Sequence, residues 1–179
     1  MDLVPLSQEH RQALLDFTTE FIDAGEEHIP GFLPDPGWTF ELTVRGFEDQ
    51  SNGVGLPEGW VPGTTRFLTH DGRILGVFNL RHRLTDGLRQ FGGHVGYSVR
   101  PAERLHGHGT KLLLGAMSLA RQLGIERLLV TCDRDNVASA RVIVTCGGRL
   151  EDCRQVEELG EVCRYWIDLT TPSDEGRHP

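Results

Sequence analysis

A glycine-rich stretch from Arg104 to Gly109, Arg-Leu-His-Gly-His-Gly, is the part of the sequence best suited to chemistry. It follows a strand-like run from Phe91 to Val99 and precedes apolar residues at helical spacing that continue to Leu123. Glycines let a backbone approach a ligand closely, and the first N–H groups of a helix have no partner within that helix. Because these donors converge at the positive end of the helix dipole, the stretch predicts a site for a phosphate-bearing ligand.

Two common phosphate-binding loops have different residue patterns. The loop of nucleoside triphosphatases needs Gly-Lys-Ser/Thr, whereas Lys111 follows Thr110 in this chain. The dinucleotide-binding loop needs a third glycine three residues after Gly109, where the chain has Leu112. Both nucleotide classes are therefore disfavoured.

The pattern that fits is Gln/Arg-x-x-Gly-x-Gly/Ala, with Arg104, Gly107 and Gly109 in its three defined places. This pattern resembles motif A of the GNAT family of N-acetyltransferases. It is short, and two glycines also serve to loosen an ordinary strand-to-helix turn. Support for the resemblance has to come from a second signature.

That second signature begins at Asn136, with Ser139 three places later, an aliphatic residue at six places and Gly147 at eleven. It resembles motif B of the same family. Strand-like runs flank it, so order and spacing match the family core from about residue 63 to 169. Residues 92–101, 131–133 and 164–167 also resemble one uncharacterised branch of predicted acetyltransferases.

The resemblance implies an α/β (α+β) fold, with a mixed, mostly antiparallel central sheet flanked by helices on both faces. Helical spacing predicts a helix from an N-cap at Ser7 to about Gly25, another from Thr39 to about Gln50, and one over 108–123. Strands are expected over 65–69, 74–84, 91–99, 127–132, 149–156 and 162–169, with Asp71-Gly72 as a hairpin turn. We expect one domain over residues 1–170, a polar tail over 171–179, and a proline-rich loop over 28–37 that borders the acceptor pocket.

Composition is that of an ordinary globular chain, with 179 residues of which 38% are hydrophobic. No run approaches the roughly twenty apolar residues of a membrane helix, and the N-terminus, with Asp2 and Glu9, is unlike a secretion signal. We therefore expect a cytoplasmic location and no membrane partner.

Cysteine and histidine spacing predicts neither a metal site nor a disulfide framework. The four cysteines, at 132, 146, 153 and 163, contain no Cys-x-x-Cys pair, so we expect reduced, mostly packed thiols. His106 and His108 stand at a helix entrance, where their side chains diverge and no carboxylate cluster surrounds them. We expect them to be solvated or to contact phosphate.

Charge is distributed unevenly along the chain. Residues 1–60 hold twelve acids against Arg11 and Arg45, whereas residues 61–179 hold fourteen acids against sixteen bases. A nucleic-acid partner is not expected for such a chain. In the family the first part of the fold borders the acceptor, so its acidity would attract a cationic amine, with a merely solvated acidic surface as the alternative.

The resemblance also implies which residues hold acetyl-CoA. The backbone of Tyr97, Ser98 and Val99 would bind the pantetheine arm as a neighbouring strand would, with one N–H aimed at the thioester oxygen. Pyrophosphate would lie on the backbone N–H groups of Leu105, His106, Gly107, His108, Gly109 and Thr110. The Arg104 side chain would add charge there or face solvent. Asn136, with Ser139, would contact the cofactor arm, cap its own helix, or do both.

The resemblance leaves the catalytic acid unassigned, because many family members have a tyrosine seven residues after the motif B asparagine and this chain has Ile143. Tyr165 is a candidate to protonate the leaving thiolate, with a core aromatic as the alternative. His82 and His94 are equal candidates for the general base and are preferred to Glu103.

These inferences predict an acetyl-CoA-dependent N-acetyltransferase, without a metal, that transfers an acetyl group directly to a primary amine of a small cationic molecule or a peptide. The alternative is a non-catalytic sensor that binds acyl-CoA. A homodimer is possible by resemblance, although no segment identifies an interface.

Overall fold

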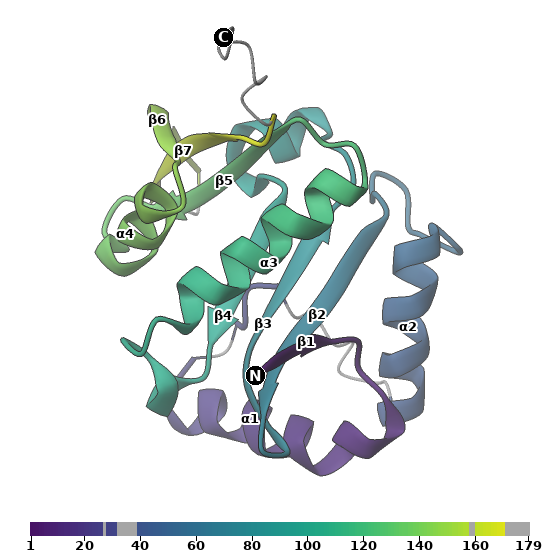
Figure 1. The fold of residues 1–179 in the computed structure, drawn as a ribbon. Coiled ribbons are helices and arrows are strands. Elements are labelled where there is room, and N and C mark those ends of the chain that lie inside the picture. Colours follow the sequence, from purple (N-terminus) through teal and green to yellow (C-terminus); the bar gives the residue numbers. More distant parts are fainter. Residues whose placement is uncertain (27, 32–38, 158–159, 171–179) are drawn as a thin grey trace, which may run out of the picture.

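Seven strands form one mixed sheet in the computed structural model, which describes residues 1–26, 28–31, 39–157 and 160–170 (Figure 1). The strands are β1 (Asp2–Val4), β2 (Gly63–His70), β3 (Arg73–Arg81), β4 (Val95–Val99), β5 (Arg127–Asp133), β6 (Arg149–Val156) and β7 (Gly160–Asp168). Their order across the sheet is β1-β2-β3-β4-β5-β7-β6. Of the pairings between these strands, only β4 with β5 is parallel. The predicted mixed, mostly antiparallel sheet is confirmed.

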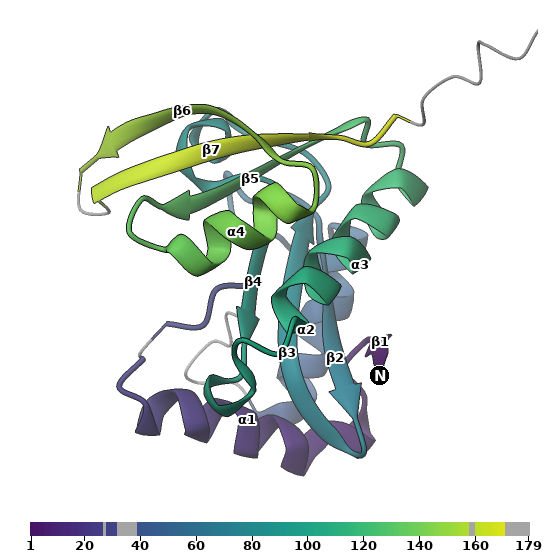
Figure 2. The same cartoon turned by 60° about the vertical axis from the view of Figure 1, so that its left-hand side comes forward.

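Helices cover both faces of this sheet. They are α1 (Arg11–Asp23), α2 (Phe40–Asn52), α3 (His108–Gln122) and α4 (Val137–Thr145). Figures 1 and 2 show α3 crossing one face, with α1 and α2 on the other. Among the described residues, no helix is both long and apolar enough to cross a membrane.

Local sequence signals place most of these elements correctly. The side chain of Thr39 accepts a hydrogen bond from the backbone of Leu42, as expected for the N-cap of α2. Asp71 and Gly72, with φ of 47° and 75°, make the predicted turn between β2 and β3. Gly124, with φ of 73°, follows the end of α3.

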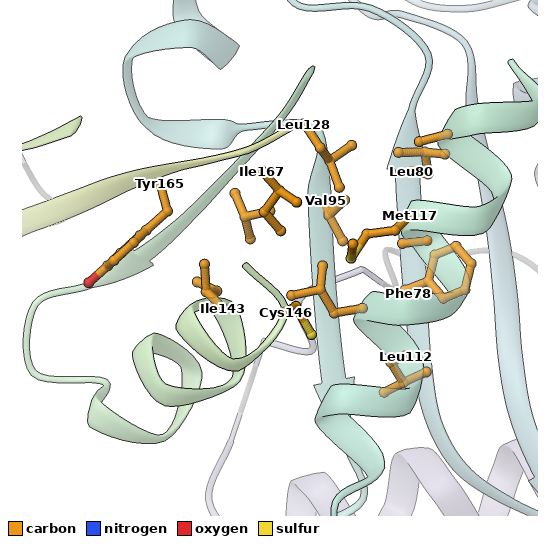
Figure 3. Packing of buried hydrophobic residues seen from close by; sticks show 14 of the residues in the cluster. Phe78, Leu80, Val95, Leu112, Met117, Leu128, Ile143, Cys146, Tyr165 and Ile167 are labelled. Carbon is orange, nitrogen blue, oxygen red and sulfur yellow. The ribbon is translucent and has the colours of Figure 1, made fainter. Parts of the chain in front are cut away.

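Two apolar clusters hold the layers together. The larger one lies between the sheet and the α3 and α4 face, and Figure 3 shows Phe78, Leu112 and Met117 packed within it. The smaller one joins α1 to β2 and β3 through residues such as Phe17 and Phe67. Because burial of apolar area is the main stabilising term, the larger cluster fixes α3 and α4 over one face of the sheet and the smaller cluster fixes α1 over the other.

The structure differs from the predicted strands in two places. The predicted strand over 91–99 begins only at Val95, because residues Leu88–Gly92 form a π-helical turn. Gly93 then has φ of 62°, and a Cβ there would lie 2.8 Å from the carbonyl oxygen of Leu129. The edge strand β1 was not predicted, since three residues are too few to show alternation.

The expectation that all cysteines are reduced is wrong for two of them. Cys153 in β6 and Cys163 in β7 form a disulfide, with their Cα atoms 4.0 Å apart. They are direct partners in an antiparallel pair of strands, and the spacing of cysteines along a sequence does not reveal such register. Cys132 and Cys146 are free and buried, as expected.

Two expectations fall largely outside the described residues. The proline-rich loop over 28–37 is described only as far as Gly31, and the tail over 171–179 is not described. Ile29 and Pro30 belong to the described part, and the backbone of Gly31 lies against that of Gly96 in β4.

Candidate active site

The parallel strands β4 and β5 separate along their length. Their register contains one pair, Val95 with Val130, at the beginning of β4. Beyond it the two strands diverge, as Figure 2 shows. The later residues of β4 therefore have backbone groups that β5 does not satisfy. These groups lie on the side where the two backbones diverge, and we call this divergence the opening.

Backbone direction decides which residues of β4 face this opening. The backbone N–H and C=O groups of successive residues in a strand point alternately to its two neighbouring strands. Tyr97 and Val99 therefore direct these groups to the same side as Val95, which pairs with β5. The guanidinium of Arg104 donates to the carbonyl oxygen of Val99 at 3.3 Å, in agreement with that direction. Ser98 directs its backbone toward β3, and its hydroxyl donates to the carbonyl oxygen of Pro30 at 2.8 Å.

The entrance to α3 lies at the end of β4 and has no side-chain cap. Gly107 is left-handed, with φ of 80°, and Leu105 is too, with φ of 64° and 96% of its surface exposed. A non-glycine residue in this region costs free energy. None of the backbone N–H groups of residues 105–110 donates to another residue that the structure describes. The loop thus presents a set of unsatisfied donors at a helix N-terminus.

The first turn of α3 packs closely against α4 and β4. A Cβ on Gly109 would lie 3.3 Å from a methyl group of Val142 and 3.5 Å from the ring of Tyr97. His108 is buried, and its Nδ1 has no hydrogen-bond partner among the described residues. A buried polar atom without a partner is costly, so this close packing leaves one unfavourable polar group at the helix entrance.

Arg104 joins the loop to the end of α1. It lies 2.7 Å from the carboxylate of Glu26, and this hydrogen bond is the main cause that lowers the pKa of Glu26. A second link lies beside it, where Glu20 accepts hydrogen bonds from Arg100 and from the backbone of Ala102. The Arg104 side chain is therefore held by Glu26 and does not extend freely into solvent. The sequence offered no signal for this long-range pair.

The entrance to α4 lies across the opening and is closed by its own cap. Asn136 Oδ1 accepts a hydrogen bond from the backbone of Ser139 at 3.0 Å. The Tyr97 hydroxyl lies 2.9 Å from the Ser139 hydroxyl, so this pair joins β4 to the first turn of α4. Burial raises the pKa of Tyr97 to about 12. Sequence reasoning used only the backbone of Tyr97 and missed this position of its side chain, which strand alternation could have indicated.

His94 lies at the closed end of the strand pair, with its ring buried. Its Nδ1 accepts a hydrogen bond from the backbone of Leu129 at 2.9 Å, and its ring lies edge-on to Trp166. Burial, together with the charges of Arg89 and Arg81, lowers the pKa of His94 to about 4. An imidazole whose Nδ1 is engaged as an acceptor carries its proton on Nε2 at neutral pH and does not take up another.

The structure does not bring His82 to the opening. Its Nε2 lies 2.8 Å from the Thr64 hydroxyl, beyond the pairing of Leu80 with Val95. Tyr97 pairs with Phe78, further along β3 in the other direction. Burial lowers the pKa of His82. His82 therefore lies toward the end of the sheet away from the glycine-rich loop.

Tyr165 and Ile143 both belong to the larger buried cluster. Tyr165 is 8% exposed and Ile143 is fully buried. Figure 3 shows the Tyr165 ring at one end of the cluster, with its hydroxyl directed away from Ile167 and Val95. Burial raises the pKa of the Tyr165 hydroxyl. The position where many relatives carry a tyrosine is thus a core position in this chain.

Glu103 has a structural contact that fits its place beside the loop. Its carboxylate accepts a hydrogen bond from Arg73 at 2.9 Å and lies 3.7 Å from Nε2 of His108.

His106 and His108 have ring centres 6.2 Å apart. Within the described ranges, no group of three or more His, Cys, Asp or Glu side chains is arranged to hold a metal ion.

The sequence matches the acetyltransferase (GNAT) domain family over residues 3–149. The chain belongs to this family. It is therefore an acetyltransferase, and the glycine-rich loop and the capped helix entrance correspond to the two motifs that the sequence resembled. A search of curated proteins finds no significant match.

Solved structures agree with the GNAT fold. A putative acetyltransferase, yncA, from Salmonella typhimurium with its cofactor acetyl-CoA has a TM-score of 0.63 and 19% identity, over 96% of this chain and 95% of that one. RimL, a ribosomal L7/L12 alpha-N-protein acetyltransferase in complex with coenzyme A, has a TM-score of 0.67 and 19% identity, over 93% and 92%. An acetyltransferase from Salmonella typhimurium that modifies the N-terminal serine of L7/L12 has a TM-score of 0.65 and 18% identity, over 93% of each chain.

Proposed function

We propose that this GNAT protein is an acetyl-CoA-dependent N-acetyltransferase that transfers the acetyl group directly to a primary amine in a ternary complex. The observation that carries the proposal is the opening between β4 and β5, which ends at the uncapped entrance of α3. A strand with free backbone groups suits an amide-containing arm, and a cluster of N–H donors suits a diphosphate. Acetyl-CoA contains both.

The proposed cofactor contacts follow from these directions. The backbone of Tyr97 and Val99 would pair with the pantetheine arm, and the N–H groups of residues 105–110 would hold the pyrophosphate. Ser98 would contribute indirectly, because its backbone faces β3 and its hydroxyl holds Pro30. The free amide nitrogen of Asn136 would contact the arm while its oxygen caps α4. Arg104 would exchange Glu26 for phosphate or would hold both.

The Tyr97 hydroxyl is the group that we assign to the leaving thiolate. With a pKa of about 12 it stays protonated, so it donates a hydrogen bond rather than its proton. The thiolate is the weaker base of the two, since free thiols titrate near about 8.5. Ser139, 2.9 Å away, would orient the hydroxyl. Tyr165 remains a second candidate for this role, and only 8% of its surface is exposed.

No histidine is assigned as the general base in this proposal. His94 is neutral, with its Nδ1 engaged by Leu129, and His82 lies toward the far end of the sheet. The amine nitrogen would attack the acetyl carbon as the free base, the carbon–sulfur bond would break, and the amine proton would pass to water or to the thiolate. A rate that rises with pH until the acceptor amine is deprotonated is the expected signature.

The acceptor is proposed to be a small cationic amine or the amine of a peptide. Two of the neighbouring structures are acetyltransferases of a ribosomal protein, which supports a peptide. The acidic surplus of the first sixty residues is partly neutralised, because Glu20 and Glu26 pair with Arg100 and Arg104 from the later part of the chain. Attraction of a cation by that surface is accordingly weaker than the sequence count suggests.

The test combines binding with turnover. Calorimetric titration of acetyl-CoA into the full-length protein is expected to show saturable binding, and thiol release from acetyl-CoA is expected with at least one member of a panel of small amines and N-terminal peptides. A titration without heat and without thermal stabilisation would contradict the site. Binding without thiol release across the panel would favour the acyl-CoA sensor over the enzyme.

A further inference from the structure

Three of the four cysteines lie in one row across the sheet. Cys132 in β5 is the direct partner of Cys163 in β7, and Cys163 is the direct partner of Cys153 in β6. Direct partners on antiparallel strands have side chains on the same face, with Cα atoms about 4.5 to 5.5 Å apart. All three cysteines accordingly belong to, or pack against, the larger buried cluster.

Cys163 is therefore the middle member of the row. It forms its disulfide with Cys153 on one side, while Cys132 on the other side is free and 9% exposed. The spacing of directly paired residues lies within the range of about 4.4 to 6.8 Å that a disulfide permits between Cα atoms. Cys163 thus has two neighbours with which it can pair.

We propose that Cys132 is a site of thiol–disulfide exchange with the Cys153–Cys163 bond. The thiolate of Cys132 attacks Sγ of Cys163, so that a Cys132–Cys163 bond forms and the Cys153–Cys163 bond breaks. Cys153 leaves as a thiolate and takes up the proton that Cys132 released. One disulfide is present before and after the step, so no external oxidant or reductant is consumed.

The arrangement across the strands favours this displacement. β7 lies between β5 and β6, so Cys132, Cys163 and Cys153 follow one another across the sheet. A thiolate displaces a thiolate from the side opposite the breaking bond, and Cys132 stands on the side of Cys163 opposite to Cys153. Burial raises the pKa of the Cys132 thiol, so the exchange is slow at neutral pH.

The exchange would change the wall of the opening. Burial raises the pKa of the Cys132 thiol and the Ser139 side chain lowers it, and the Ser139 hydroxyl lies 2.9 Å from the Tyr97 hydroxyl. Pairing with Cys163 would consume the Cys132 thiol beside Ser139 and would free a thiol on β6, the last strand of the sheet. A change in the disulfide would therefore reach the candidate site through one residue, Ser139.

Disulfide mapping tests the proposal on full-length protein. Wild type and the variants Cys153→Ser, Cys163→Ser and Cys146→Ser are equilibrated in a glutathione redox buffer, trapped with an alkylating reagent, digested and analysed by mass spectrometry. We expect Cys153–Cys163 in wild type and in Cys146→Ser, and Cys132–Cys163 as the major disulfide in Cys153→Ser. Cys163→Ser should contain neither, because strands two places apart lie about 9.5 Å from each other, beyond the reach of a disulfide.

Three results would overturn the proposal. They are alkylated Cys132 and Cys163 in a Cys153→Ser variant of native circular dichroism, a Cys132–Cys153 bond formed equally well in Cys163→Ser, and a wild type without any disulfide in this buffer. If Cys153→Ser does not fold, the Cys132–Cys163 peptide is sought as the minor isomer of wild type, and its absence contradicts the exchange. Acetyl-CoA is not needed, so the outcome is independent of the proposed function.

Discussion

The helices α3 and α4 both begin where a strand of the opening ends, yet their first turns are closed differently (Figure 2). At α4 the Asn136 side chain accepts a hydrogen bond from the backbone of Ser139. At α3 the preceding residue is the left-handed Gly107, and no side chain caps the helix. A capped entrance satisfies its own donors, whereas an uncapped one leaves them for a ligand. The contrast supports our proposal that the entrance of α3 is the phosphate side of the site.

The same contrast runs along β4. At its closed end, both the backbone N–H and the ring of His94 bond to Leu129 of β5. At its open end, Tyr97 and Val99 face the opening. We therefore expect changes at satisfied groups to alter stability, and changes at unsatisfied groups to alter binding or turnover.

The largest effect is expected at the entrance of α3, where Gly107→Asp should abolish acetyl-CoA binding. A Cβ on Gly107 meets nothing within 4 Å, and Asp tolerates the left-handed conformation, so the fold should persist. A carboxylate about 4 Å from a phosphate would cost about 4 kcal/mol at an effective dielectric constant of about 20, close to a thousandfold in Kd. Calorimetric titration measures this change.

Gly107→Asn is the matched control, because it has the same shape without the charge. Its Kd for acetyl-CoA should stay within about fivefold of wild type, the equivalent of one hydrogen bond. Equal losses in the two variants would mean that the backbone conformation, rather than phosphate charge, determines affinity at this entrance.

The next largest effect is a change in stability at the end of β4 where His94 is hydrogen-bonded to Leu129 of β5. His94 has a pKa of about 4, below the value of about 6.5 of an unfolded chain, so the unfolded state binds more protons between these values. The stabilisation by neutral His94 is complete above about pH 6.5 and is lost as pH falls toward about 4, by up to about 3 kcal/mol. His94→Asn keeps an acceptor for Leu129 without the titration, so thermal unfolding should show a smaller loss of stability across this pH range.

His94→Asn also tests the absence of a histidine base. Its activity at neutral pH should remain within about threefold of wild type, since general base catalysis is typically worth about a hundredfold or more. A loss of that larger size, with the acid limb of the pH profile removed, would make His94 the base after all.

A smaller effect is expected where Tyr97 of β4 meets Ser139 of α4. Tyr97→Phe removes one hydrogen bond to a developing thiolate, which corresponds to about a tenfold loss in kcat. KM for acetyl-CoA should change little, because the backbone of Tyr97 is retained. Tyr165→Phe is the control, and steady-state kinetics in which it, rather than Tyr97→Phe, lowers kcat would reverse the assignment.

The smallest effect is expected at the capped entrance of α4. Asn136→Ala removes the cap and should lower the free energy of unfolding by about 1 kcal/mol. Asn136→Asp keeps the cap but replaces the amide with a charge, so urea denaturation should show nearly normal stability while the Kd for acetyl-CoA rises. Normal affinity in Asn136→Asp would restrict Asn136 to capping.

Local sequence patterns predicted most elements and the glycine-rich entrance of α3, because these features depend on neighbours along the chain. Alternation and turn residues located β2 and β3, and apolar spacing located α3. The π-helical turn before β4 was missed, since its irregular backbone depends on how closely Gly93 approaches Leu129. The short strand β1 was missed because it is defined by pairing with β2 rather than by its own residues.

Contacts between distant segments could not be predicted in the same way. Arg104 and Glu26 meet because α1 ends beside the loop. Tyr97 and Tyr165 both pack on the larger cluster and are distinguished by their neighbours, since the Tyr97 hydroxyl contacts Ser139. The row of cysteines exists only once β7 lies between β5 and β6 in one particular register. A one-residue shift of register would turn these side chains to the other face.

The sequence by itself determined the family, the order of the elements and the glycines that leave a helix entrance uncapped, because these depend on residue type and on spacing along the chain. The tertiary structure alone decided which strands diverge, which tyrosine reaches the opening, and which cysteines lie side by side. The physical reason is that divergence, burial and register are set by packing between segments far apart in sequence, and no local pattern specifies that packing.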